Sequence, residues 1–264
     1  MKTLNSFAVA LVAVSLPASF AFAGAQDGLG DGCQGTADVL IGSDDDNVDN
    51  PLIQPVAPPP NQSLNNADIL LGDGGCDVLI GLLGNDVLNG GDGDDVTIGG
   101  VENFDPDGFG NRDVIFGGAG NDTNVWAPGD GSDAFLGGPG FRDAQVFGVI
   151  DTGLDAVPDL IAVPGRFRNT GLPTADLTGS PGFCRLDIVG DETLGFDFLV
   201  RFFVRATGDL AVTIRLRDVE QVFCTSEAGG DITYADLTSS DPRFVIVSQD
   251  EVRQLNATVG RIVY

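Results

Sequence analysis

A nine-residue period that begins at Gly72 restricts the possible folds of this chain more than any other feature. Three consecutive units read GDGGCDVLI, GLLGNDVLN and GGDGDDVTI. Each unit has glycine at its first and fourth places, aspartate at its sixth place and a mostly apolar triplet at its end. Nine residues are too few for a helical hairpin, but they suit one tight loop followed by one short strand. The period therefore predicts an all-β chain, built as a solenoid of loops and strands.

The sixth-place aspartate recurs on both sides of these three units. One degenerate unit, residues 99–107, has Phe104 at this place, and the register then resumes. Two looser units follow, after steps of eleven and ten residues. The sixth-place residues, which we name the register aspartates, are Asp68, Asp77, Asp86, Asp95, Asp113, Asp122, Asp133 and Asp143. Asp38 and Asn47 are also nine residues apart, so Asp38 belongs to an earlier fragment of the array and is a further candidate ligand.

Loops of this composition are suited to bind calcium. Glycine at the first and fourth places permits the positive φ angles of a tight loop, which directs backbone carbonyl groups inward. The register aspartate adds a hard anionic oxygen, and Ca²⁺ prefers about six to eight oxygen ligands. We therefore expect several Ca²⁺ ions as cofactors. Besides the register aspartates, the candidate ligands are Gly72, Gly74, Gly90, Asp92, Asp94, Gly117 and Asn121.

Charge separates this hypothesis from a solenoid in which aspartate and glycine serve only as ordinary turn formers. Residues 24–150 contain 21 Asp and one Glu, against only Arg112 and Arg142. Stacked carboxylates a few ångströms apart repel strongly unless a cation lies between them. We therefore expect the metal-free array to be largely disordered and to fold on binding calcium. The net charge of −26 also excludes nucleic acid and anionic membranes as partners.

Two repeats, Gly90–Ile98 and Gly117–Asp122, resemble the RTX, or hemolysin-type, calcium-binding repeat G-G-x-G-x-D-x-U-x. The segment WAPGDGSD at 126–133, followed by GGPG at 137–140, is similar to a segment that closes many such arrays. The resemblance implies a right-handed parallel β-roll with two units per coil, so that loops eighteen residues apart stack around Ca²⁺. Asp77, Asp95 and Asp113 would then line one edge of the roll. Asp68, Asp86 and Asp122 would line the other.

The apolar triplets also indicate which side chains of each strand face the core and which face outward. Alternate residues of a strand face opposite ways, so the eighth-place residues Leu70, Leu79, Leu88 and Ile115 should face the core. The seventh and ninth places should face outward, yet they include Ile69, Leu71, Val78, Ile80, Ile98, Val114 and Phe116. We infer that one sheet is covered, either by the C-terminal region or by a protein or polysaccharide partner. The alternative is that these residues are simply good strand formers.

The ends of the array define the domain organisation. Residues 1–23 have the short positive start, apolar run and Ala-Phe-Ala site of a secretory signal peptide, which predicts a secreted mature chain with no membrane span. The calcium-binding array occupies residues 24–150, with a Pro-rich insertion at 50–65. Export favours disulfides, and of the three possible pairings the local one joins Cys33 to Cys76 and Cys184 to Cys224.

Residues 151–264 form a C-terminal β region that caps the solenoid or continues it. Two of its strands could pair across the turn at 207–209. The region reads either as irregular further coils or as a small β domain. Its predicted strands are Phe183–Val189, Phe196–Ala206, Leu210–Leu216, Glu220–Cys224 and Arg243–Ser248.

The chain contains no histidine, which excludes a Ser-His-Asp triad and a His-Glu-x-x-His zinc protease. It also lacks G-x-S-x-G and phosphate-binding loop motifs, so we expect no enzyme. The sequence predicts a secreted, calcium-stabilised scaffold or surface module. A calcium-dependent adhesin or matrix component is the alternative, and a secreted hydrolase carrying RTX repeats is less favoured.

Overall fold

The computed structural model describes residues 39–41, 68–82, 84–100, 112–152, 158–161, 171–189 and 192–264, all of which belong to one compact unit. The predicted signal peptide, the Pro-rich insertion, Asp38 and Cys33 lie outside the described residues. Within the described part of the chain, no helix is long and apolar enough to cross a membrane.

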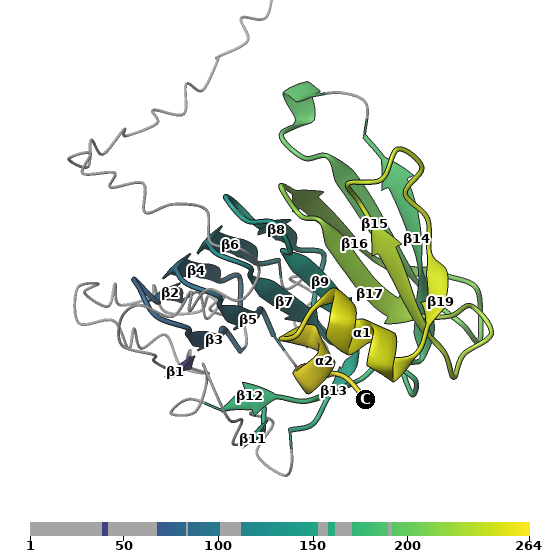
Figure 1. Ribbon diagram of the computed structural model, residues 1–264, viewed down its shortest axis with the longest axis horizontal. Coiled ribbons are helices and arrows are strands. Elements are labelled where there is room, and N and C mark those ends of the chain that lie inside the picture. Colours follow the sequence, from purple (N-terminus) through teal and green to yellow (C-terminus); the bar gives the residue numbers. More distant parts are fainter. Residues whose placement is uncertain are drawn as a thin grey trace, which may run out of the picture. The chain divides into compact units, whose positions relative to one another are not determined.

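The strands of the repeats alternate between two sheets, which lie face to face (Figure 1). Sheet A contains, in spatial order, β1 (Val39–Ile41), β3 (Val78–Ile80), β5 (Val96–Ile98), β7 (Thr123–Trp126), β9 (Ala144–Phe147), β17 (Gln221–Thr225), β18 (Ile232–Asp236) and β19 (Val245–Val247). Sheet B contains β14 (Gly182–Ile188), β15 (Phe198–Val204), β16 (Leu210–Arg217), β8 (Ala134–Leu136), β6 (Val114–Ala119), β4 (Val87–Asp92) and β2 (Ile69–Leu71). The prediction of a mostly β chain with parallel sheets is therefore confirmed.

The remaining elements are short. Two small ladders join β10 (Val149–Ile150) to β13 (Ala175–Asp176) and β11 (Leu160–Ile161) to β12 (Leu172–Pro173). A 3₁₀ turn, η1, spans Glu192–Leu194. The chain ends in the helices α1 (Gln249–Leu255) and α2 (Val259–Ile262). The capping box of Ser248 and Glu251 begins α1 and satisfies amide groups at its start.

Strand pairing within the repeats is parallel and closely follows the period. Val78 pairs with Val96 in sheet A, and Ile69 pairs with Val87 in sheet B. Past the degenerate unit, Val96 pairs with Thr123. β4 pairs directly with β6 and β5 with β7, so the pairing step across the degenerate unit is 27 residues in both sheets, as from Val87 to Val114.

The C-terminal strands extend both sheets. Ala134 of β8 pairs with Arg215 of β16, and Ala144 of β9 pairs with Gln221 of β17, both in parallel. Antiparallel strands then follow outward, β15 and β14 on sheet B and β18 and β19 on sheet A. The predicted hairpin across residues 207–209 is confirmed as the β15–β16 pair. Strand β18 was not predicted.

Two apolar clusters lie on opposite faces of sheet A. The inner cluster fills the space between the sheets and contains the predicted core residues, together with Trp126 and Phe202. The outer cluster joins Val78, Ile80 and Ile98 to residues of α1, α2 and the segment 172–177. These three side chains are fully buried, so the C-terminal region covers sheet A, as one of the two predicted alternatives requires.

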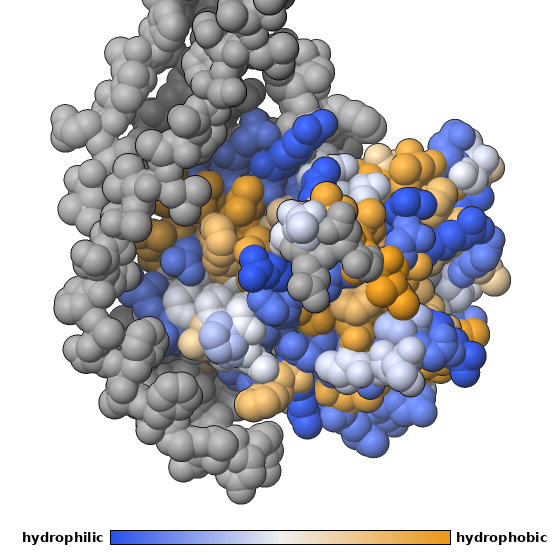
Figure 2. Space-filling model, turned by 90° about the horizontal axis from the view of Figure 1, so that it is seen from above, coloured by the Kyte–Doolittle hydropathy of each residue, from blue (hydrophilic) through white to orange (hydrophobic). Residues whose placement is uncertain are grey.

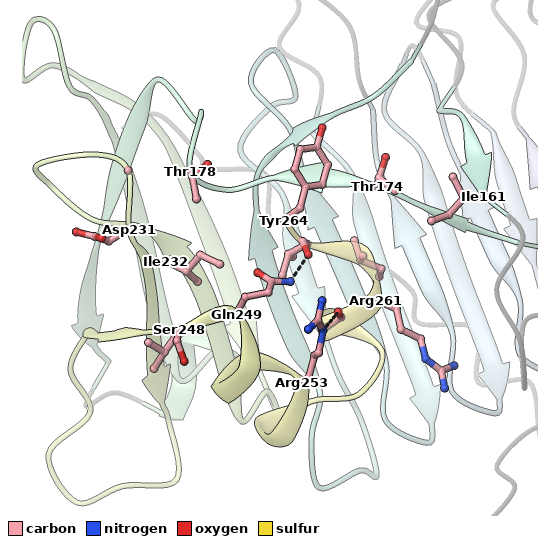
Figure 3. A pocket seen from close by; sticks show the side chains of 15 residues that line it. Ile161, Thr174, Thr178, Asp231, Ile232, Ser248, Gln249, Arg253, Arg261 and Tyr264 are labelled. Carbon is pink, nitrogen blue, oxygen red and sulfur yellow. Dashed lines mark hydrogen bonds between the residues drawn. The ribbon is translucent and has the colours of Figure 1, made fainter.

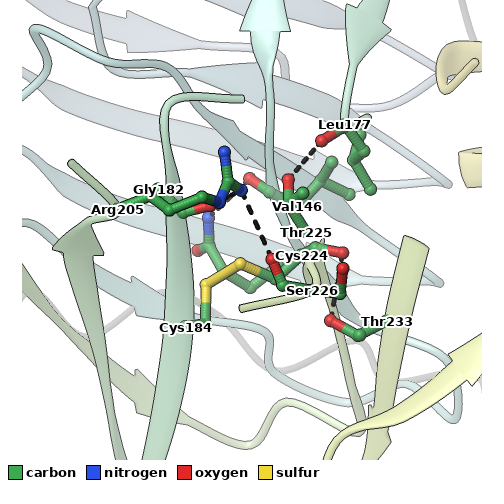
Figure 4. The surroundings of a disulfide bond; sticks show 10 residues. Val146, Leu177, Gly182, Cys184, Arg205, Cys224, Thr225, Ser226 and Thr233 are labelled. Carbon is green, nitrogen blue, oxygen red and sulfur yellow. Dashed lines mark hydrogen bonds between the residues drawn. A yellow bond between two sulfur atoms is a disulfide. The ribbon is translucent and has the colours of Figure 1, made fainter. Parts of the chain in front are cut away.

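One disulfide bond connects the two sheets. Cys184 of β14 is bonded to Cys224 of β17, as in the local one of the three possible pairings (Figure 4). The guanidinium of Arg205 lies beside this bond and donates to the backbone carbonyls of Ser180, Gly182 and Ser226. The other bridge of the local pairing includes Cys33 and so lies outside the described residues.

We predict that the cover of sheet A contributes strongly to stability. Ile262 of α2 is fully buried against this sheet, so Ile262→Ala should lower the free energy of unfolding by about 2–5 kcal/mol. Ile246 of β19 is 66% exposed, and Ile246→Ala should change it by less than about 1 kcal/mol. Urea denaturation of both variants with calcium present would measure the difference. Equal losses would contradict a tightly packed cover.

Candidate metal centre

The register aspartates form two columns, one at the start of each sheet's strands. The A column precedes strands of sheet A and consists of Asp77, Asp95, Asp122 and Asp143, with Glu220 at its end. The B column precedes strands of sheet B and consists of Asp68, Asp86, Asp113 and Asp133.

This arrangement corrects the predicted edges at two residues. Asp113 was expected beside Asp77 and Asp95, but it stacks on Asp86 at a separation of 27 residues. Asp122 stacks on Asp95 at the same separation, rather than on Asp86. The pairing step of 27 residues, in place of 18, explains the exchange, because one additional unit in the step moves every later aspartate to the opposite edge.

Each column is held together by carboxylate–amide hydrogen bonds. In the A column, Oδ1 of Asp95, Asp122 and Asp143 accepts the backbone N–H of the preceding column member at 2.7–2.8 Å. The amide of Asp143 donates to Oε2 of Glu220 at 2.8 Å, so a glutamate takes the same role in the last coil. One oxygen of each side chain therefore joins its own coil to the coil before it.

The B column repeats the pattern with the same atoms. Oδ1 of Asp86 and Oδ1 of Asp113 each accept an amide at 2.7 Å, and Oδ1 of Asp133 accepts the amide of Asp113 at 2.9 Å. All eight register aspartates are buried, with exposures of 0–7%. Burial of this many carboxylates is costly unless each is hydrogen-bonded and its charge is balanced.

The second oxygen of four register aspartates is left without a partner. Oδ2 of Asp95, Asp122, Asp133 and Asp143 is buried and makes no hydrogen bond among the described residues. Buried polar atoms are nearly always satisfied, so a group of such oxygens calls for a ligand. These atoms fit a bound cation, since an ionised carboxylate oxygen can only accept.

First-place glycines lie beside three of these oxygens, those of Asp95, Asp122 and Asp143. A Cβ on Gly90 would lie 2.3 Å from Asp95 Oδ2 and 2.5 Å from the Gly117 carbonyl oxygen. A Cβ on Gly117 would lie 2.5 Å from Asp122 Oδ2 and 2.6 Å from the Gly137 carbonyl oxygen. A carboxylate oxygen and a carbonyl oxygen of the next coil therefore lie close together beside each of these glycines, and such hard oxygen donors suit a cation.

The role predicted for these glycines was wrong in one respect. Gly72, Gly90 and Gly117 are not among the residues with positive φ, which fall instead at the second and fourth places, as at Gly91 (104°) and Gly93 (144°). The first place requires glycine because a side chain would collide with the carboxylate and with the next coil.

The other predicted ligands divide into two groups. Asp94 is buried, and its Oδ1 accepts both the backbone amide and the side-chain amide of Asn121, at 2.9 and 3.2 Å. These two predicted ligands therefore bond to each other across coils. Asp92 is exposed, and it bridges to Gly74 through the backbone.

Asp130, which is not a register aspartate, lies beside the last two members of the B column. Carboxylate atoms of Asp113, Asp130 and Asp133 lie within 4.8 Å of one another, and all three residues are buried. This group could hold a metal ion. The predicted ligand set omitted Asp130, although the step of eleven residues from Asp122 to Asp133 marked a loop with two additional residues.

A hollow of about 840 Å³ lies apart from the columns (Figure 3). It is lined by residues of the C-terminal helices, including Arg253 and Arg261, and by residues of the 171–178 segment, including Thr174. Arg253 already donates to the Gly260 carbonyl and to Asp250. No register aspartate lines this hollow, so the columns remain the candidate site.

No family model, curated protein or solved structure matches the chain. The geometry and chemistry of the columns are therefore the basis for inferring the function.

Burial perturbs the column carboxylates strongly when no cation is present. Loss of hydration is the largest cause, and it raises the pKa of Asp95 from 3.8 to about 7, that of Asp143 to about 8 and that of Asp122 to about 9. Neighbouring carboxylates raise these pKa values further, whereas the amide hydrogen bonds lower them.

These shifts predict an unusual pH dependence for the chelator-treated protein. A carboxyl group with a raised pKa in the fold stabilises the fold below pH 4, and this stability is lost as pH rises toward 7–9. The metal-free protein should therefore melt at a lower temperature at pH 8 than at pH 5, and saturating calcium should remove the deficit. Melts followed by circular dichroism would check this. A metal-free melting temperature that rises with pH would contradict it.

Proposed function

We propose that the protein is a secreted, calcium-stabilised β-roll that serves as a non-catalytic scaffold or surface module. The observation that carries the proposal is the set of buried Oδ2 atoms of Asp95, Asp122 and Asp143, which have no hydrogen-bond partner among the described residues and face glycine-lined spaces. Cations between the coils would satisfy these atoms and neutralise the columns.

Calcium is the cation that the donor set favours. The donors are carboxylate and carbonyl oxygens, which are hard ligands suited to Ca²⁺ or Mg²⁺. Ca²⁺ accepts variable coordination at about 2.3–2.6 Å, whereas Mg²⁺ demands near-octahedral geometry and keeps its waters. A repeated slot with one carboxylate and one carbonyl per coil, such as that at Gly90, is adaptable and so suits Ca²⁺ better.

Calcium binding and folding should be thermodynamically coupled in this arrangement. The columns bring together oxygens from coils 18–27 residues apart, so the ligand set exists only in the folded chain. Each carboxylate also holds the amide of the neighbouring coil, and cations would keep it ionised for that purpose. Export supports the same function, because millimolar calcium and a disulfide such as Cys184–Cys224 both belong to extracellular compartments.

An adhesin or matrix role is the second candidate, and the outer face of sheet B favours it. Ile69 and Leu71 of β2 and Val114 and Phe116 of β6 are 37–42% exposed there. Apolar surface also shows between polar side chains in the space-filling view (Figure 2). Cosedimentation of the calcium-loaded protein with cells or polysaccharide would separate the two roles, since a pure scaffold would remain in the supernatant.

We predict that calcium removal unfolds the repeats. A site filled at one hundred times its dissociation constant adds about 2.7 kcal/mol to the free energy of unfolding. Several filled sites should therefore raise the melting temperature markedly and increase the β signal in circular dichroism. Identical spectra and melting temperatures in chelator and in calcium would refute the proposed function.

Asp95→Asn should weaken calcium binding and also relieve repulsion in the metal-free chain. The variant keeps an oxygen that can accept the Asp77 amide, but it loses one buried charge. We expect calcium affinity to fall at least about tenfold, the size of effect seen even when an outer partner of a metal site is removed. Calorimetric titration would measure this. Asp231→Asn, on an exposed turn, is the matched control and should bind calcium as the unaltered chain does.

A further inference from the structure

The loop between β7 and β8 departs from the regular repeat. Its two additional residues place Asp130 in the B column, where Asp130 Oδ1 accepts the amide of Gly131 at 2.8 Å. Thr97 pairs with Asn124 in sheet A. Trp126 lies two residues after Asn124, so it occupies the position that Gly99 has in the preceding coil. The first-place glycine is therefore absent from this coil, and a third carboxylate is present instead.

The three carboxylates are arranged to contact one ion. Two oxygens bound to the same Ca²⁺ at about 2.4 Å can be at most about 4.8 Å apart, and the carboxylate atoms of Asp113, Asp130 and Asp133 fall within that limit. Asp133 is 1% exposed. Its Oδ1 is occupied by the Asp113 amide, whereas its buried Oδ2 makes no hydrogen bond within the described part of the chain.

The same loop contacts the C-terminal strands. The Thr213 amide of β16 donates to Ser132 Oγ at 3.2 Å, and the Arg215 amide donates to the Asp133 carbonyl at 3.0 Å. The Arg215 guanidinium donates to the Ser132 carbonyl at 3.4 Å and attracts the Asp133 carboxylate. Three carboxylates against one guanidinium leave two negative charges, which one divalent cation would balance.

Trp126 connects this loop to the core between the sheets. Its Nε1–H donates to the Gly131 carbonyl at 3.0 Å, and its ring lies 4.7 Å from that of Phe202 in β15 and 5.5 Å from that of Phe147. The position of the loop that carries Asp130 therefore determines how the indole packs against a C-terminal strand.

We propose that Asp113, Asp130 and Asp133 form a separate Ca²⁺ site, different in composition from the slots between regular loops, which fastens the repeats to the C-terminal strands. The choice of Ca²⁺ as the ion rests on the proposed function, but the existence of the site does not. Three carboxylates in one site should also bind more tightly than the single carboxylate of a regular slot, so this site should fill first.

Trp126 is the only tryptophan in the chain, which makes the site selectively observable. Tb³⁺ accepts the same oxygen ligands as Ca²⁺ and emits when a nearby excited indole transfers energy to it. Titration of the full mature chain with Tb³⁺, with tryptophan excited selectively, should give sensitised emission at the lowest Tb³⁺ concentrations. Added Ca²⁺ should abolish this emission by competition.

Asp130→Asn should lower the Tb³⁺ affinity seen through tryptophan at least about tenfold, while calcium-induced β signal from the columns persists. Asp209→Asn removes one charge from an exposed turn and should leave the emission unchanged. Trp126→Phe should abolish the emission but keep the number of bound Ca²⁺ ions.

The outcomes separate the two proposals. Unchanged sensitised emission in Asp130→Asn would overturn the junction site and leave calcium-dependent folding intact. Absence of any calcium effect on circular dichroism would overturn the proposed function, whereas the Tb³⁺ emission would still decide the site. If Asp130→Asn does not fold, the unaltered chain decides, because a lack of tryptophan-sensitised emission from its Tb³⁺-bound form would itself refute the junction site.

Discussion

Repulsion between stacked, buried carboxylates is the constraint on which the rest of this structure depends. The A column places Asp77, Asp95, Asp122 and Asp143 on successive coils, away from water and without a basic side chain in the column. Amide hydrogen bonds to Oδ1 offset part of the cost, but the raised pKa values of three members show that burial outweighs them. Either protons or bound cations must supply the balance.

The need for glycine at the first and second places of the loops follows from the same close stacking. At the first place, a carboxylate and the next coil's carbonyl approach so closely that no Cβ fits, as at Gly90. At the second place, Gly91 needs a positive φ, and a Cβ there would meet the Asp73 carbonyl at 2.2 Å. The spacing of the coils is therefore set by backbone contact in the loops as much as by the strands.

Much of the repeat geometry could be predicted from the sequence because the period is local. The sixth-place aspartates and the inward eighth-place residues follow from spacing, whereas the Cys184–Cys224 bond was only the local one of three possible pairings. The exchange of Asp113 and Asp122 between columns could not, because sequence alone does not say whether a degenerate unit supplies a strand. Asp130 was missed for a related reason, since it lies outside the nine-residue register. Helices α1 and α2 are too short to give a clear periodic signal, although their burial on sheet A explains the apolar outer places of that sheet, Val78, Ile80 and Ile98.

The continuation of both sheets into β16 and β17 has a consequence for the assembly of the chain. The coil that ends with β9 offers the edges of β8 and β9 to later segments, and β16 and β17 pair with those edges. An isolated array that stopped near residue 150 would leave two adjacent strand edges unpaired, an arrangement that invites another copy to add in register. The C-terminal segment therefore occupies the two strand edges through which an isolated array could pair with another copy.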